Sequence, residues 1–220
     1  VRGAPTLLYV GSFHEANRLG VTFLVAEVLP LVRALLPDVR LTIVGWKPAE
    51  FTSVVRGVPY TSPLPVFVAG IVGDLAPFFV NASAMVAPTM VEGTGLSTKV
   101  LIGLQNGMHV VTTPEGAKGV PCAAASLCER LLHVALPRAA PFSHAVAAAV
   151  AAASEEPVAE AHEQQVDLGQ TAHAWTGVSA LIRMLHGEIE GRPGDEQSRG
   201  QSSDDELSYE SNEPNADLVT

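Results

Sequence analysis

The stretch of sequence that decides the predicted fold runs from Met85 to Thr113: MVAPTMVEGTGLSTKVLIGLQNGMHVVTT. It reads as an apolar strand at Ala84–Ala87, a glycine-rich turn, a helix near Thr98–Gln105 and a second apolar strand at His109–Thr113. A strand that leads through such a turn into a helix leaves unpaired backbone N–H groups and the positive end of a helix dipole beside the turn. The stretch therefore predicts a site for the phosphate of a nucleotide or of a sugar phosphate.

The same alternation of strands and helices precedes this stretch. Apolar runs that close at a turn or a glycine predict three strands: Thr6–Val10, Val39–Val44 and Val66–Gly70. Apolar residues at helical spacing predict a helix over Val21–Leu36, which Pro30 should bend or break, and a short helix over Asp74–Phe79. This order predicts an α/β fold, a Rossmann-like parallel sheet with helices on both faces.

Two further helices and a polar tail follow. The helices are expected at Ser143–Ser154 and Ala172–Leu185, so that residues 1–190 form one Rossmann-like domain. Residues 191–220 are polar, acidic and poor in large apolar side chains, which predicts a disordered tail. An acidic docking or phosphorylation segment around Ser202 and Ser203 is the alternative for this tail.

Composition argues against several classes of protein. The net charge of −10 argues against a nucleic-acid surface, because phosphate contacts need clustered Lys and Arg. No apolar run is long enough to cross a bilayer and no targeting segment is visible, so we expect no transmembrane segment and a cytoplasmic location. Cys122, Cys128 and the scattered histidines form no disulfide framework or metal motif, which predicts reduced thiols and no metal site.

One order of residues is typical of a known family. It consists of a proline, an acidic residue among glycines, a later glycine and a second apolar strand: Pro88, Glu92–Gly93, Gly95–Leu96, Gly107 and Val110–Pro114. This order resembles the donor-binding signature of the GT-B glycosyltransferases, in the large family that includes sucrose synthases and bacterial polysaccharide glycosyltransferases. Leu7–Phe13 and Leu41–Gly45 resemble the opening of that family's second domain, and the resemblance covers about residues 5–187.

The resemblance implies that the parent protein is a glycosyltransferase. Residues 1–190 would be the nucleotide-sugar-binding domain, the second half of a GT-B fold. The implied reaction is a retaining, metal-independent transfer from a nucleoside-diphosphate sugar, without a cofactor. The acceptor would be held by an N-terminal domain that this chain does not contain, and no catalytic residue is assigned.

The sequence departs from the family pattern at the helix that follows the turn. The family's helix carboxylate, usually credited with a ribose contact, falls at Val100 when counted from Glu92 and at Ile102 when counted from Gly107. Neither aliphatic side chain accepts a hydrogen bond. A non-catalytic binding or scaffold module is therefore the alternative function, and a sugar-nucleotide epimerase is a third hypothesis.

The resemblance also implies a substrate-binding site. Its members are glycines, residues with amide or hydroxyl donors, one carboxylate and two basic side chains: Gly11, Ser12, Arg18, Glu92, Gly93, Thr94, Gly95, Leu96 and Lys99. Gly11 would let the backbone approach a diphosphate, and Arg18 and Lys99 would supply charge to its oxygens. The structural alternatives are an ordinary turn at Gly11, a solvent-facing Arg18 and a helix-dipole contact for Glu92.

Overall fold

The fold is organised by one parallel sheet. The computed structural model of the chain describes residues 3–59, 65–93, 95–120 and 125–155. Six strands pair in the order β3-β2-β1-β4-β5-β6: β1 (Thr6–Val10), β2 (Arg40–Val44), β3 (Val66–Gly70), β4 (Ala84–Ala87), β5 (Val110–Thr112) and β6 (Leu132–Val134). Every pairing is parallel, which confirms the predicted Rossmann-like α/β fold.

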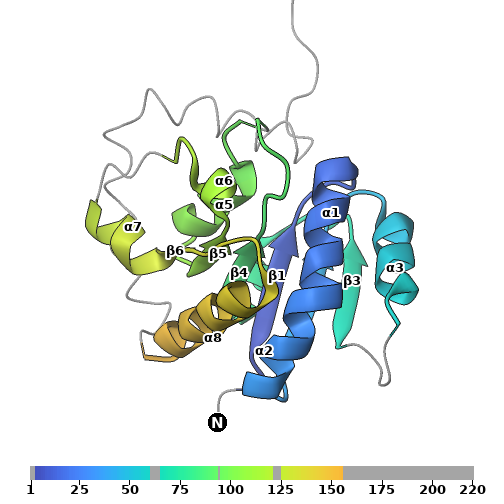
Figure 1. Cartoon of the computed structure of the whole chain (residues 1–220), viewed down its shortest axis with the longest axis horizontal. Coiled ribbons are helices and arrows are strands. Elements are labelled where there is room, and N and C mark those ends of the chain that lie inside the picture. The colour runs from blue at the N-terminus through green and yellow to red at the C-terminus, as the bar shows by residue number, and fades with distance from the viewer. Residues whose placement is uncertain (1–2, 60–64, 94, 121–124, 156–220) are drawn as a thin grey trace, which may run out of the picture.

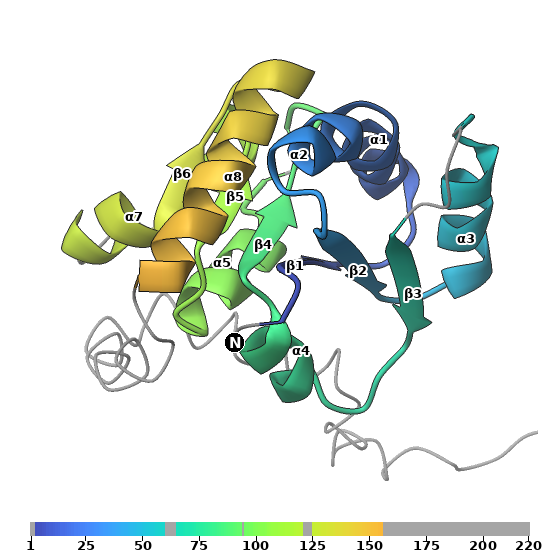
Figure 2. The same ribbon diagram turned by 90° about the horizontal axis from the view of Figure 1, so that it is seen from below.

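Helices cover both faces of the sheet (Figures 1 and 2). One face carries α1 (Glu15–Phe23), α2 (Leu29–Leu35), α3 (Pro48–Gly57) and α8 (Ala139–Glu155). The opposite face carries α4 (Ala76–Asn81), α5 (Thr98–Gln105) and α7 (Ala125–Leu131). The short helix α6 (Pro114–Ala117) follows β5 directly.

The strands fill two separate cores, one under each layer of helices. Along β1, Leu7 and Tyr9 join the core under α1 and α8, whereas Leu8 joins the core under α4 and α5. Strand β4 divides in the same way, with Val86 on the first side and Met85 on the second. Successive strand residues point to opposite faces, so continuous apolar runs are what a doubly covered sheet requires.

The first helical region differs from the prediction in both its start and its continuity. It begins at Glu15 rather than at Val21 and continues to Leu35 through a π-helical turn, η1 (Leu24–Val28). In that turn the backbone N–H of Leu29 donates to the carbonyl of Leu24, five residues earlier. Proline has no N–H to donate, and the wider turn just before Pro30 lets the helix pass it without a break.

Other predicted elements are found with small shifts in their ends, and four elements were not predicted. The unpredicted elements are short or bury little: α3, α6, α7 and β6. Helix α3 is the exception in length, and a signal for it was present: Phe51, Val54, Val55 and Val58 are apolar at helical spacing, and all four pack on the core under α1 and α8. The helix expected at Ala172–Leu185, the 1–190 boundary and the tail at 191–220 lie outside the described residues.

The expectation of a reduced thiol is wrong at Cys128, which is disulfide-bonded. Cys128 lies on α7, and Cys122 falls outside the described residues. Spacing along the chain does not settle such a bond, because a disulfide depends on how close the fold brings two Cα atoms.

Two glycines let the first two strands approach closely where they end. The N–H of Gly11 donates to the carbonyl of Val44 at 2.9 Å. A Cβ atom on Gly45 would lie 1.8 Å from the carbonyl oxygen of Gly11. Real Cβ atoms do not come so near to backbone oxygens, so any side chain at Gly45 would push the ends of β1 and β2 apart.

We expect Gly45→Ala to destabilise the protein by about 3 kcal/mol, as overpacking against immovable neighbours does. Urea unfolding measures the change in the free energy of unfolding. The matched control is Gly57→Ala at the end of α3, where an added Cβ would meet no atom within 4 Å. Equal effects of the two substitutions would contradict the steric argument.

A pair of histidines joins the last two strands. His109 Nδ1 and His133 Nε2 lie 3.0 Å apart, so one ring donates a hydrogen bond to the other. This contact needs at least one neutral ring, because two protonated rings have no acceptor nitrogen. Burial lowers the pKa of His133, which also favours its neutral form.

From the histidine pair we expect the free energy of unfolding to decrease in acid. Because the folded pKa of His133 is lower than the unfolded value, the unfolded chain binds more protons as the pH falls through the unfolded pKa, about 6.5. The free energy of unfolding, measured in urea at pH 7.5 and 5.5, should therefore decrease at the lower pH. His133→Phe should reduce this decrease, whereas His144→Gln, at an exposed position on α8, should leave it unchanged.

Candidate functional site

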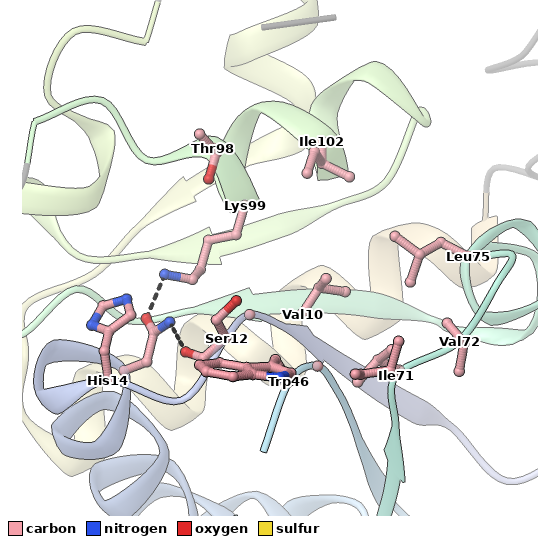
Figure 3. A pocket seen from close by; sticks show the side chains of 14 residues that line it. Val10, Ser12, His14, Trp46, Ile71, Val72, Leu75, Thr98, Lys99 and Ile102 are labelled. Carbon is pink, nitrogen blue, oxygen red and sulfur yellow. Dashed lines mark hydrogen bonds between the residues drawn. The ribbon is translucent and has the colours of Figure 1, made fainter. Parts of the chain in front are cut away.

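A cavity of about 600 Å³ opens at the carboxyl edge of the sheet. The ends of β1 and β2, the segment after β3, and helices α1 and α5 supply its lining: Val10, Gly11, Ser12, His14, Asn17, Val44, Gly45, Trp46, Ile71, Val72, Leu75, Thr98, Lys99 and Ile102 (Figure 3). Its position follows from the topology. The chain leaves β1 toward β2 on one side and later returns to β4 on the other, and such a reversal opens a crevice between the helices that follow these strands.

Lys99 is held in this cavity by a hydrogen bond from one helix to another. Its Nζ atom donates to Asn17 Oδ1 at 2.8 Å, and Asn17 Nδ2 donates to the carbonyl oxygen of Ser12 at 2.6 Å (Figure 3). Asn17 is only 5% exposed. The ammonium group also lies 5.8 Å from the ring centroid of Tyr9. These contacts fix the amine at the crevice between α1 and α5.

The surroundings of Lys99 favour an anionic ligand. Burial lowers the pKa of Lys99 to about 8, so most of the amine is still charged at neutral pH. None of the described residues that line the cavity is acidic. The ammonium has three N–H donors, and the bond to Asn17 uses one of them. An anion such as a phosphate would supply both the missing counter-charge and the missing acceptors.

Three of the predicted site residues line the cavity together: Gly11, Ser12 and Lys99. Arg18 does not join them. Its guanidinium forms a two-bond ion pair with Glu15 on the exposed surface of α1, with N–O distances of 2.6 and 2.8 Å.

The predicted glycine-rich turn lies outside the lining of the cavity. Glu92, Gly93, Gly95 and Leu96 are exposed, and Thr94 lies outside the described residues. The two glycines have positive φ angles of 74° and 73°, a conformation that favours glycine.

A carboxylate of the chain itself lies at this turn. The N–H of Gly93 donates to Glu115 Oε1 at 2.9 Å, and Glu115 forms an ion pair with Lys118. The hydrogen bond from Lys118, followed by that from Gly93, lowers the pKa of Glu115. Glu115 therefore remains charged at neutral pH and holds the amide that was predicted to face a phosphate.

Ser97 occupies the N-cap position of α5. It has extended backbone angles, but its hydroxyl makes no capping hydrogen bond. Its Oγ atom is buried without a hydrogen-bond partner among the described residues. Ser97 thus immediately precedes the helix that carries Lys99.

Asn17 is not among the site residues predicted from the sequence, yet it is the residue that holds Lys99 in place. A signal was present: Asn17 lies three and four positions before Gly20 and Val21, on the buried face of α1. A polar side chain on such a face requires a hydrogen-bond partner inside the protein. The lining residues Trp46, Ile71 and Val72 carried no comparable signal.

The described ranges contain no group of three or more His, Cys, Asp or Glu side chains placed to hold a metal ion. In the same ranges, no helix is both long and apolar enough to span a bilayer.

Solved structures with a similar fold include two with TM-scores above 0.5. S. aureus TarM, in complex with Fondaparinux, alpha-GlcNAc-glycerol and UDP, has a TM-score of 0.54 and 15% identity over 80% of this chain and 35% of that chain. A UDP-forming alpha,alpha-trehalose-phosphate synthase from Burkholderia vietnamiensis has a TM-score of 0.51 and 13% identity over 84% of this chain and 44% of that chain. This chain thus spans less than half the length of either protein.

A third similar structure is the C-terminal domain of LpcC, a glycosyl transferase group 1 family protein from Francisella tularensis. It has a TM-score of 0.48 and 14% identity, over 79% of this chain and 88% of that domain. At these identities the likenesses concern the fold alone. No curated protein matches the chain.

A family model supplies the assignment that the individual structures do not. The model described as Glycosyl transferases group 1 matches residues 4–152. This range is more than half of the chain and contains all six strands and every residue that lines the cavity. The resemblance found in the sequence is confirmed: the chain belongs to the glycosyl transferases group 1 family.

Proposed function

We propose that this chain is the donor-binding half of a glycosyltransferase and binds a nucleoside-diphosphate sugar in the cavity at Lys99. The observation that carries the proposal is the charged, partly buried Lys99 amine in a cavity whose described lining residues include no acidic side chain. The volume of about 600 Å³ lies in the range typical of small-molecule sites. Membership of the family supports the same donor class.

In this proposal the protein stabilises the leaving diphosphate. Breaking the bond between the sugar and the diphosphate leaves extra negative charge on the phosphate oxygens. A positioned cation lowers the barrier when it meets charge that develops in the transition state. Lys99 would supply this charge, and the hydrogen bond from Lys99 to Asn17 would keep the amine in place as the reaction proceeds. Retention of configuration and independence of a metal ion belong to the proposal through the family resemblance.

The acceptor would be bound by a separate N-terminal domain of the parent protein. The structurally similar TarM and trehalose-phosphate synthase chains are more than twice as long as the part that this chain matches. We therefore expect this chain alone to bind donor weakly and to transfer little sugar.

A non-catalytic binding module is the second candidate, and two observations favour it. Ile102 lines the cavity in place of a carboxylate, and the Gly93 amide is held by Glu115. Isothermal titration with nucleoside diphosphates and their sugars separates the candidates. Submillimolar binding supports the donor site, and a folded chain that binds none of them supports the scaffold.

The first prediction from the proposed site compares two basic residues. Lys99→Met should weaken the binding of the best-bound nucleoside diphosphate at least tenfold, because hydrogen bonds to charged groups contribute about 1.5–3 kcal/mol. Arg18→Gln should change the dissociation constant less than about threefold, because its guanidinium is paired with Glu15 outside the cavity. Calorimetry on both variants, with their melting temperatures as a check of folding, tests the assignment. A larger loss for Arg18→Gln would contradict it.

The second prediction concerns pH. Deprotonation of Lys99 as the pH rises through about 8 removes the charge that attracts the diphosphate. The dissociation constant should therefore be nearly constant from pH 7 to 7.5 and then rise, approaching about tenfold per pH unit well above 8. Lys99→Arg keeps its charge throughout this range and should flatten the profile. A wild-type profile that is flat to pH 9.5 would exclude Lys99 as the recognising cation.

A further inference from the structure

The cavity has two chemically different ends. The polar end gathers the side chains that can donate or accept hydrogen bonds: Ser12, His14, Asn17, Thr98 and Lys99. The aliphatic end is lined by Val10, Ile71, Val72, Leu75 and Ile102. Among the labelled side chains, Figure 3 shows Ser12, His14 and Lys99 on one side of the cavity and Ile71, Val72 and Leu75 on the other. A ligand that fills this space meets charge at one end and hydrocarbon at the other.

Helix α5 fixes how these ends are spaced. Lys99 and Ile102 are three residues apart on α5 and both line the cavity, so they lie on one face about one turn apart. Their Cβ atoms are therefore separated by about 5–6 Å. In a nucleoside diphosphate the pentose is joined directly to the phosphate nearer the base. With the diphosphate at Lys99, the pentose would lie against Ile102 and its aliphatic neighbours.

The aliphatic end offers no side-chain acceptor to a pentose hydroxyl. Valine, leucine and isoleucine have no hydrogen-bonding atoms in their side chains. Some of the nearby backbone groups already form hydrogen bonds. The carbonyl of Val44 accepts from the Gly11 N–H, and the N–H of Gly45 donates to the carbonyl of Gly70, both at 2.9 Å. Trp46 lines the cavity with 54% of its surface exposed, and the Lys47 ammonium lies over its ring, 4.8 Å from the centroid. A base that stacks on Trp46 would use the opposite face of the ring.

We propose, on the basis of the function proposed above, that this site recognises the diphosphate and base of its ligand but not the ribose hydroxyls. It accepts ribonucleoside and 2′-deoxyribonucleoside diphosphates alike, and Ile102 is the residue that determines this tolerance. A site built to hydrogen-bond a substrate hydroxyl rejects the analogue that lacks it by about 10⁴–10⁵, whereas an aliphatic wall discriminates weakly.

The test is a pair of titrations on the full 220-residue chain. The ribonucleoside diphosphate that binds best and its 2′-deoxy counterpart, for example UDP and dUDP, are compared by calorimetry. We expect dissociation constants within about threefold of each other, because the extra hydroxyl gains no partner at the aliphatic end.

Two variants test whether Ile102 determines the ratio of the two dissociation constants. Ile102→Gln adds an acceptor without adding charge, and it should shift the ratio of the two dissociation constants at least about fivefold in favour of the ribonucleotide. Ile102→Val keeps the wall aliphatic and is the matched control, with an unchanged ratio. Melting temperatures check that each variant is folded, and the wild-type ratio remains decisive if Ile102→Gln does not fold.

The outcomes separate this inference from the proposed function. A wild-type preference of tenfold or more for the ribonucleotide overturns the inference and leaves donor binding intact. A folded Ile102→Gln with the wild-type ratio overturns the role of Ile102. If a folded wild-type chain binds neither nucleotide of any base, both the proposed function and this inference are overturned.

Discussion

The hydrogen bond from Lys99 to Asn17 joins helix α5 to helix α1 in the cavity at the carboxyl edge of the sheet. Asn17 belongs to the helix after β1, and Lys99 belongs to the helix after β4. Burying a charged amine is unfavourable, which is why the pKa of Lys99 falls to about 8. Asn17 supplies one acceptor but no negative charge. An anionic ligand is therefore favoured twice, because it adds acceptors and also restores the missing counter-charge.

The contact between Lys99 and Asn17 depends on the close approach of β1 and β2 where these strands end. Gly45 has no room for a Cβ beside the Gly11 carbonyl, so the two strand ends meet directly beneath the cavity. The same turn after β1 places the Ser12 carbonyl where it accepts from Asn17. Backbone geometry at two glycines thus positions the asparagine, and the asparagine positions the lysine.

The sequence was sufficient to predict five of the six strands, because these are apolar runs and a parallel sheet covered on both faces needs such runs. The sixth strand, β6, was not predicted, because it has three residues and none of them is fully buried. The sequence did not predict where the first helix starts or that it continues past Pro30, because both depend on more than the apolar pattern. The start of the first helix at Glu15 lies among polar residues, and the passage of Pro30 depends on the π-helical turn. For the site, the order of strands placed Lys99 at the carboxyl edge of the sheet, where it lines the cavity. The contact between Gly93 and Glu115, 22 residues apart, could not be predicted from local patterns.

The hydrogen bond from Gly93 to Glu115 argues against the glycine-rich turn as an open phosphate site. A backbone amide that faces a phosphate must be open to it, but the Gly93 N–H already donates to the charged Glu115 carboxylate. A diphosphate that approached the same amide would meet this negative charge before it met the donor. Lys99 has the opposite character, because the described residues that line its cavity include no carboxylate. In the proposed function, anion recognition therefore depends on Lys99, and a diphosphate could accept from the Gly93 N–H only if the Glu115 carboxylate moved away from it.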